Sequence, residues 1–111
     1  MEAKTKIIFL DENGDKFFGE GPYQLLLGVE RTGSLRCAAM EMGMAYSKAM
    51  KLVRHAEAAL GFPLTQRTVG GASGGGSCLT PRGKEWMSRY GDYRDACAQA
   101  NARLYLEFFP G

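Results

Sequence analysis

The segment SLRCAAMEMGMAYSKAMKLVRHAEAAL, residues 34–60, decides the fold. It holds two stretches with the apolar spacing of helices, separated by a glycine. Ala39, Gly43 and the apolar Met44 have the spacing expected where two helices cross closely through a tight turn. The small residue lets the second helix approach, and the glycine turns the chain. We therefore predict a helix-turn-helix over about 34–60, with a generic pair of packed helices as the alternative.

Both helices have local signals at their starts and along their buried faces. The Ser34 hydroxyl can cap the first helix by accepting a hydrogen bond from a free backbone N–H, and Gly43 suits a left-handed helix end. The positions expected to be buried are Leu35, Ala38, Ala39 and Met42 in the first helix and Ala49, Leu52, Val53, Ala56 and Leu60 in the second. The second helix runs from about Ala45, and its other face carries Ser47, Lys48, Lys51, Arg54 and His55.

Upstream, the sequence predicts a hairpin and one more helix. Residues 4–10 have the composition of a strand, and the Asn-Gly pair within residues 12–15 suits a hairpin turn. A short returning strand would include residues 17–18. Gly21-Pro22 then opens a helix that ends near Gly33, with an apolar face formed by Tyr23, Leu26, Leu27 and Val29 or Glu30.

Downstream, a second hairpin follows the helix-turn-helix. Residues 64–69 alternate as a strand, residues 78–80 close the hairpin, and five of the seven residues from 70 to 76 are glycine. Helix, helix and hairpin in this order form a winged helix, with the wing at about 64–80. Thr80 can cap a last helix at about 81–108, because Pro81 suits the first helical position, where its missing N–H costs no hydrogen bond.

The last helix carries an apolar seam at alternating intervals of four and three residues. Its members are Trp86, Tyr90, Tyr93, Cys97, Ala100 and Leu104. The seam extends further than the core of a small winged helix can cover, and an exposed apolar seam favours a partner. We expect a homodimer in which this helix and the N-terminal strands share the interface. The alternative is that the N-terminal hairpin alone covers the seam.

Composition bounds the class of protein. A chain of 111 residues supports one core, so we expect a single domain over 1–111, and 45% hydrophobic with 23% charged residues is typical of a soluble globular protein. No apolar run approaches the roughly 20 residues of a membrane span, and no targeting segment is recognisable at the N-terminus. We therefore expect a cytoplasmic protein without membrane contact.

The net charge of +2 is unevenly distributed. Between Arg31 and Lys84 lie eight basic and two acidic residues, a net charge of +6, whereas the rest of the chain sums to −4. A basic middle favours a polyanionic partner. Three widely spaced cysteines argue against a disulfide framework, so we expect Cys37, Cys78 and Cys97 to be buried apolar residues. His55, the only histidine, is expected on a solvated helix surface.

The glycine-rich stretch lacks the phosphate-binding motifs of enzymes. A P-loop needs lysine directly after its last glycine, but Gly76 is followed by Ser77, and a dinucleotide-binding pattern fails because Leu79 stands three positions on. The acidic residues within 11–15 surround a predicted turn. We therefore expect no enzyme, no catalytic residue, no cofactor and no metal site.

At this point the sequence resembles the N-terminal winged-helix domain of ModE-type, molybdate-responsive transcriptional regulators, which are LysR-like. The resemblance rests on Gly33-Ser34, Ala38-Ala39, residues 43–49, Pro63-Leu64 with Arg67, Gly70-Gly71, Gly74-Gly75-Gly76 and residues 79–83. It implies an α+β, mainly helical winged helix-turn-helix with an N-terminal β-hairpin and a long C-terminal dimerisation helix. It further implies a homodimer on a palindromic operator, with the helix from about Ala45 in the major groove and the wings on flanking DNA.

Two features depart from the family pattern. Met50 stands where the family usually has Trp, which we interpret as a core substitution. Full regulators of this type continue into molybdate-binding domains, and we expect none within these 111 residues. A separate effector-sensing partner would then supply any response to an oxyanion.

The resemblance places the expected double-stranded DNA contacts on three segments. We expect them from Ser34, Arg36, Tyr46, Ser47, Lys48, Lys51, Arg54, Arg67, Thr68, Ser73 and Ser77. Residues at the start of the second helix are expected at base edges, and those further along at phosphates. A winged helix that binds RNA or a protein, without operator recognition, remains the alternative because the fold alone fixes no function.

Overall fold

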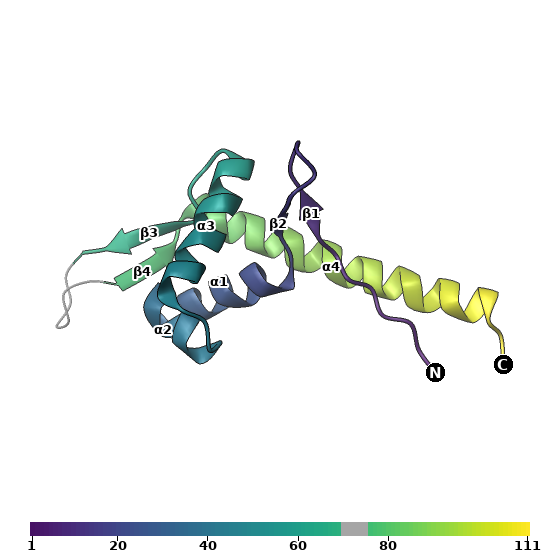
Figure 1. The fold of residues 1–111 in the computed structure, drawn as a ribbon. Helices are drawn as coiled ribbons and strands as arrows, with labels where there is room; N and C mark the ends of the chain where they lie inside the picture. Colours follow the sequence, from purple (N-terminus) through teal and green to yellow (C-terminus); the bar gives the residue numbers. More distant parts are fainter. Residues whose placement is uncertain (70–75) are drawn as a thin grey trace.

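The computed structural model describes residues 1–69 and 76–111 and is a mainly helical α+β winged helix-turn-helix, as predicted (Figure 1). The prediction for Ser73 and the glycine-rich tip falls on residues 70–75, outside the described residues. The elements in chain order are β1 (Phe9–Leu10), β2 (Lys16–Phe18), α1 (Glu20–Thr32), α2 (Leu35–Glu41), α3 (Tyr46–Leu60), β3 (Thr65–Thr68), β4 (Gly76–Leu79) and α4 (Pro81–Phe108).

The N-terminal hairpin is shorter than the sequence predicted. Strand β1 has two residues instead of the seven expected over 4–10, because β2 ends at Phe18 and α1 begins at Glu20, which leaves earlier residues without a partner strand. The carbonyl oxygens of Ala3 and Ile7 instead accept hydrogen bonds from Asn101 and Tyr90 of α4. The N-terminal segment is therefore attached to α4 rather than to a sheet.

The core lies between α1, α2, α3 and the first half of α4. Its fully buried side chains include Phe18, Leu25, Leu26, Val29, Ala49, Leu64 and Tyr90. Helices α1 and α2 pack closely, since a Cβ added to Gly28 would lie 2.9 Å from the Cβ of Ala38. The predicted inward position of Met42 is wrong: this residue caps the C-terminus of α2 and is 40% exposed.

The wing is an antiparallel pair, with Thr65 opposite Leu79 and Thr68 opposite Gly76. Two backbone contacts fix it to the helices. The Ser77 N–H donates to the Gly33 carbonyl at 2.8 Å, and a side chain at Gly76 would collide with that same carbonyl oxygen. The wing can therefore lie this close to the end of α1 only without a side chain at position 76.

Helix α4 begins against the start of β3. The Thr80 hydroxyl donates to the Pro63 carbonyl at 2.7 Å and accepts from the Gly83 N–H at 2.9 Å, which confirms the predicted cap. The 28-residue helix then projects from the body beside the N-terminal segment, so the molecule measures 58 × 30 × 25 Å (Figure 1). None of the helices in the described part of the chain has the length and apolar character required to span a membrane.

The predicted burial of the three cysteines is wrong for Cys37, which is exposed, and Cys78 and Cys97 are only half-buried. Cys37 lies on α2 between the inward positions Leu35 and Ala38, so its side chain faces outward. Free cysteines are often buried, but whether a particular cysteine is buried depends on which face of its helix it occupies.

Substitution of Gly83 tests the contact between α4 and β3. An added Cβ would collide with the Leu64 carbonyl oxygen and lie 3.0 Å from the Thr80 hydroxyl. We expect Gly83→Ala to lower the free energy of unfolding by about 1–3 kcal/mol, the usual cost of overpacking. The measurement is guanidinium unfolding followed by circular dichroism.

The matched control is Gly21→Ala, because no heavy atom lies within 4 Å of a Cβ added there. Within helix α1 this change should be neutral or stabilising by up to about 1 kcal/mol. Equal unfolding midpoints for the two variants would contradict the close approach of α4 to Leu64.

Candidate DNA-binding surface

The N-terminus of α2 is held by hydrogen bonds around Ser34. Its hydroxyl accepts from the Cys37 N–H at 3.1 Å, which confirms the predicted cap, and its own N–H donates to the Thr32 hydroxyl at 3.2 Å. Ser34 is half-buried in this arrangement. The side chain is therefore first a structural cap, and its remaining hydroxyl proton is available for a second acceptor.

The starts of α2 and α3 are joined by a cation–π contact. The Arg36 guanidinium carbon lies 4.2 Å from the centre of the Tyr46 ring, and both side chains are exposed. Such a contact contributes about 0.5–1 kcal/mol at an exposed site. It also limits the positions that the guanidinium adopts, so that Arg36 is oriented before any ligand arrives.

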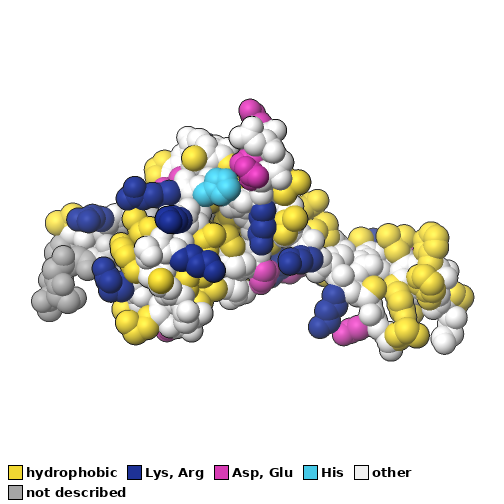
Figure 2. Space-filling model, viewed as in Figure 1, with side chains coloured by type: hydrophobic (Ala, Val, Ile, Leu, Met, Phe, Trp, Pro, Cys, Tyr) yellow, Lys and Arg dark blue, Asp and Glu magenta, His cyan; other side chains and the backbone are white. Residues whose placement is uncertain are grey.

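The outward face of α3 is basic. At 100° per residue, Ser47, Lys48, Lys51 and Arg54 fall together with His55 within an arc of roughly 120°, and all are exposed. The one acidic residue of α3, Glu57, lies outside this arc, and its carboxylate accepts a hydrogen bond from the Leu64 N–H at 2.8 Å. Figure 2 shows Lys and Arg side chains gathered over this part of the molecule.

The start of α3 has free backbone donors. Ala45, the residue before it, offers no side-chain cap to the first turn. The helix N-terminus also has the positive end of the helix dipole, which favours anions. Together with the arc of basic side chains, this end of α3 has the chemistry of a phosphate-binding surface.

On the wing, the predicted residues differ in their availability. Arg67 is exposed, whereas Thr68 and Ser77 are half-buried. The Thr68 hydroxyl accepts from the Gly76 N–H at 2.9 Å, and the Ser77 backbone binds Gly33. Arg67 is therefore the freely exposed side chain among these three, and the other two first stabilise the wing itself.

His55 is exposed as predicted, but it also has a partner that the sequence did not indicate. Its Nε2 atom lies 3.3 Å from a carboxylate oxygen of Asp11. A backbone hydrogen bond from Asp15 holds the pKa of the Asp11 carboxyl below its ordinary value, and His55 acts in the same direction. The contact joins the hairpin turn to α3 and marks the acidic boundary of the basic face.

The residues predicted for the dimer interface fall into two groups. Tyr90 is 2% exposed, and its ring packs against those of Phe18 and Tyr23 at centroid distances of 4.9 and 5.0 Å. Trp86, Cys97 and Ala100 are half-buried, whereas Tyr93 and Leu104 are about half exposed. The Cys97 thiol beside Tyr93 raises the pKa of that phenol.

The N-terminal hairpin covers the near end of the seam, since the Phe9 ring contacts the rings of Trp86, Tyr90 and Tyr93. Tyr90 is thus covered within its own chain, by the hairpin together with Tyr23 of α1. In the distal half of α4, Leu104 and Phe108 are exposed and lie one turn apart on the same side of the helix as Tyr93. The hairpin therefore leaves the distal end of this side of α4 without cover.

Metal-binding side chains are dispersed over the described residues. Within 1–69 and 76–111, no three His, Cys, Asp or Glu side chains come together as a group that could hold a metal ion.

A capped short helix, a tight turn, a second helix with a basic outer face and a wing define a winged helix-turn-helix domain of the DNA-binding class. The chain matches the model for the bacterial regulatory helix-turn-helix protein, LysR family, over residues 23–84, and it belongs to this family. The match places the chain among helix-turn-helix regulatory proteins. The match begins in α1 and ends in the first turn of α4, so it includes the wing.

One relative of the chain is named as a molybdenum-pterin-binding protein. The molybdenum-pterin-binding protein MopB of Rhodobacter capsulatus is 34% identical over 84 residues, which are 76% of this chain and 31% of the relative. The chain therefore spans about a third of the length of that protein. Together the two matches confirm the resemblance to the N-terminal helix-turn-helix domain of ModE and LysR-type regulators.

Two substitutions of Ser34 distinguish its role as a helix cap from its proposed contact with DNA. Ser34→Ala removes the acceptor for the Cys37 N–H and should lower the free energy of unfolding by about 1 kcal/mol. Ser34→Asp keeps a capping oxygen and should unfold like wild type, but its charge should repel DNA phosphate. Urea unfolding and titration with random duplex DNA measure the two effects. Wild-type DNA affinity for Ser34→Asp would place Ser34 outside the DNA interface.

Proposed function

We propose that the protein is a homodimeric transcriptional regulator that binds a palindromic DNA operator in the cytoplasm. The observation that carries the proposal is the exposed basic arc of α3, free of acidic side chains, in a chain of the LysR-type helix-turn-helix family. A helix of this charge fits the major groove, where the N-terminal residues of a recognition helix contact base edges.

Within this proposal the side chains have distinct roles. Ser47 and Lys48, in the first turn of α3, contact base edges, and a lysine can bind guanine O6 and N7. Lys51 and Arg54 lie further along the helix and bind phosphates. At the start of α2 and α3, the DNA backbone is contacted by Ser34, Arg36 and Tyr46. From the wing it is contacted by Arg67, Thr68, Ser73 and Ser77.

The proposed dimer uses the part of α4 that its own chain leaves uncovered. Tyr93 and Leu104 provide the exposed apolar surface, and the small side chains of Cys97 and Ala100 between them allow a second helix to approach closely. Trp86 and the N-terminal strands complete the edge, whereas Tyr90 acts from within the core. A two-fold dimer would present two α3 helices to successive major grooves, about 34 Å apart.

The biological context is proposed from the relative. MopB is named for binding molybdenum-pterin, and we propose that this chain regulates genes of molybdate or metal-oxyanion metabolism. Residues 1–111 are proposed to form one winged-helix domain, with the helix-turn-helix at about 34–60, the wing at 64–80, the dimerisation helix at 81–108, and no molybdate-binding domain among them. Sensing would then belong to a separate effector-binding partner.

Selection from random duplex DNA tests operator recognition and the roles of Lys48 and Arg67. We expect an inverted repeat to be enriched, because a two-fold dimer reads two equivalent half-sites. Lys48→Ala should weaken binding to that repeat by about 1–3 kcal/mol and binding to random DNA much less. Arg67→Ala should weaken both alike and flatten the salt dependence. Titrations at several salt concentrations give these values.

Two outcomes of this selection would contradict the proposal. If both variants bound the repeat with wild-type affinity, neither α3 nor the wing would contact the operator as proposed. Enrichment of structured RNA over duplex DNA in a parallel selection would favour an RNA-binding winged helix instead.

A charge in the seam tests the dimer. Leu104→Asp should shift the protein to monomer in sedimentation velocity, because it places a carboxylate in the proposed apolar contact between two copies of α4. Gln99→Asp is the control, since residue 99 lies on the opposite side of the helix from residue 104 and is exposed. A dimer that persists in Leu104→Asp would exclude this face of α4 from the interface.

A further inference from the structure

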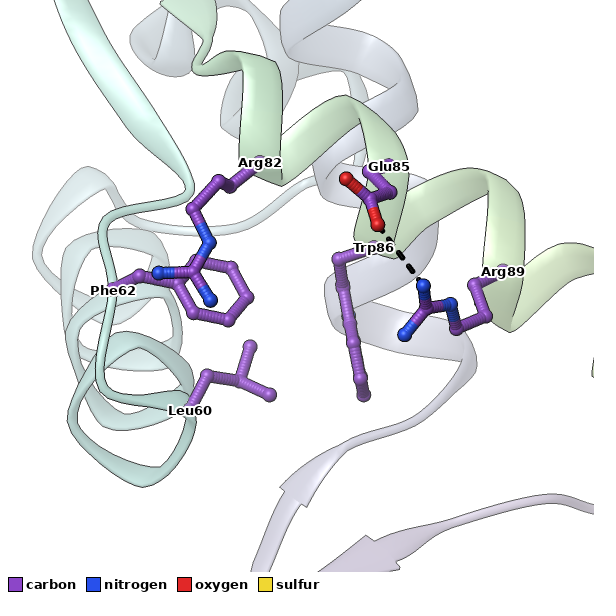
Figure 3. Close-up of a pocket in the computed structure, with 6 residues that line it drawn as sticks. All are labelled: Leu60, Phe62, Arg82, Glu85, Trp86 and Arg89. Atoms are coloured by element: carbon purple, nitrogen blue, oxygen red, sulfur yellow. Dashed lines mark hydrogen bonds and ion pairs between the residues drawn. The ribbon is translucent and has the colours of Figure 1, made fainter.

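A pocket lies between the C-terminal end of α3 and the first turns of α4 (Figure 3). Its lining residues are Leu60, Phe62, Arg82, Glu85, Trp86 and Arg89. Phe62 and Trp86 face each other across the opening, with Leu60 between them at the base. The Arg82 guanidinium lies over the Phe62 ring at 4.0 Å, so the wall of the pocket combines an apolar surface with a positive charge.

Positive charge exceeds negative charge in this pocket. The Glu85 carboxylate is already bound by Arg89 at 2.9 Å. Two arginines against one glutamate leave a net positive charge. The pocket is thus complementary to an apolar group that is flanked by negative charge.

The size of the pocket decides the kind of occupant. Its volume is about 170 Å³, whereas pockets for small-molecule ligands are usually about 300–1,000 Å³. A space of this size suits one apolar side chain of a protein. Trp and Arg, which form its walls, are also the residues enriched at the energetic centres of protein interfaces.

The position of the pocket separates it from the candidate DNA-binding surface. Leu60 ends α3, and at 1.5 Å per residue it lies roughly 20 Å along the helix from Ser47. Trp86 and Arg89 also border a second pocket, with Phe9 and Tyr93, on the side of the proposed dimer seam. An occupant beside Phe62 and Arg82 would thus leave the DNA-contacting end of α3 open.

We propose that this pocket is the docking site for a protein partner that inserts one apolar side chain flanked by carboxylates. The apolar side chain lies between Phe62 and Trp86, and a carboxylate pairs with Arg82. The partner therefore presents a short acidic segment with a single apolar residue at its centre. Because the site is distant from the start of α3, this contact is compatible with bound DNA.

The intrinsic fluorescence of the protein gives a direct test, because Trp86 is the only tryptophan of the chain. The probes are blocked five-residue peptides with two glutamates on each side of a central Leu, Ile, Met or Phe. We expect at least one to change the Trp86 emission saturably below about 1 mM. Versions with central alanine, or with lysine in place of glutamate, should bind at least about tenfold more weakly, because each removes one half of the recognition.

Reversing the charge of Arg82 tests whether the peptide changes the Trp86 emission by binding in this pocket. Arg82→Glu should weaken the peptide at least about tenfold, and it should fold normally because Arg82 is exposed and an acid in the first turn of α4 suits the helix dipole. Arg103→Glu, which reverses an exposed arginine in the distal half of α4, is the control for net charge and should leave the affinity unchanged.

Three results would overturn the proposal. They are the absence of a saturable change with every peptide, binding that survives Arg82→Glu, and an emission change caused by random duplex DNA. The third would assign the pocket to nucleic acid. DNA titrations followed by anisotropy of labelled DNA test the proposed function separately, so failure of one proposal is distinguishable from failure of the other.

Discussion

The orientation of α3 depends on the close packing of α2 against α1. Only a small side chain fits where Gly28 meets Ala38, and the chain then turns through Gly43, whose φ of 65° suits glycine. The Met44 N–H closes this turn on the Ala39 carbonyl at 2.9 Å. A larger residue at either helix would separate α2 from α1 and rotate α3 with it. The orientation of the basic face of α3 therefore depends on contacts among small residues of α1, α2 and the turn.

Helix α4 belongs to two parts of the molecule. Its first half completes the core through the buried Met87 and Tyr90, and the Tyr90 ring packs against Phe18 of the hairpin and Tyr23 of α1. Its second half extends past the body and keeps an exposed apolar surface. A single helix thus fixes the wing through Thr80 at one end and offers a contact surface at the other. Rigid continuity between these halves would transmit the geometry of the proposed dimer to the proposed DNA-binding end.

The bounds of the family match coincide approximately with a structural division between the helix-turn-helix with its wing and the segments on either side. Residues 23–84 include the helix-turn-helix and the wing, which are the parts proposed to contact DNA. The N-terminal hairpin and the chain beyond Lys84 lie outside that match, and they provide Phe9, Trp86, Tyr93 and Leu104. The pocket of Figure 3 lies across this boundary, because Leu60 and Phe62 come from the matched segment and Arg89 from beyond it. A helix-turn-helix unit shared with the family is thus joined to the proposed contact surfaces outside the matched segment.

The sequence by itself determined what depends on neighbours along the chain. The Ser34 and Thr80 caps, the turn at Gly43 and the apolar period of α3 follow from hydrogen bonds and side-chain spacing within a few residues, so they could be predicted. Only the tertiary structure decided the two-residue length of β1, the exposure of Cys37, the burial of Tyr90 and the pairing of His55 with Asp11. These depend on how separate elements pack and on their rotation about their axes, which distant residues set together and which no local pattern encodes.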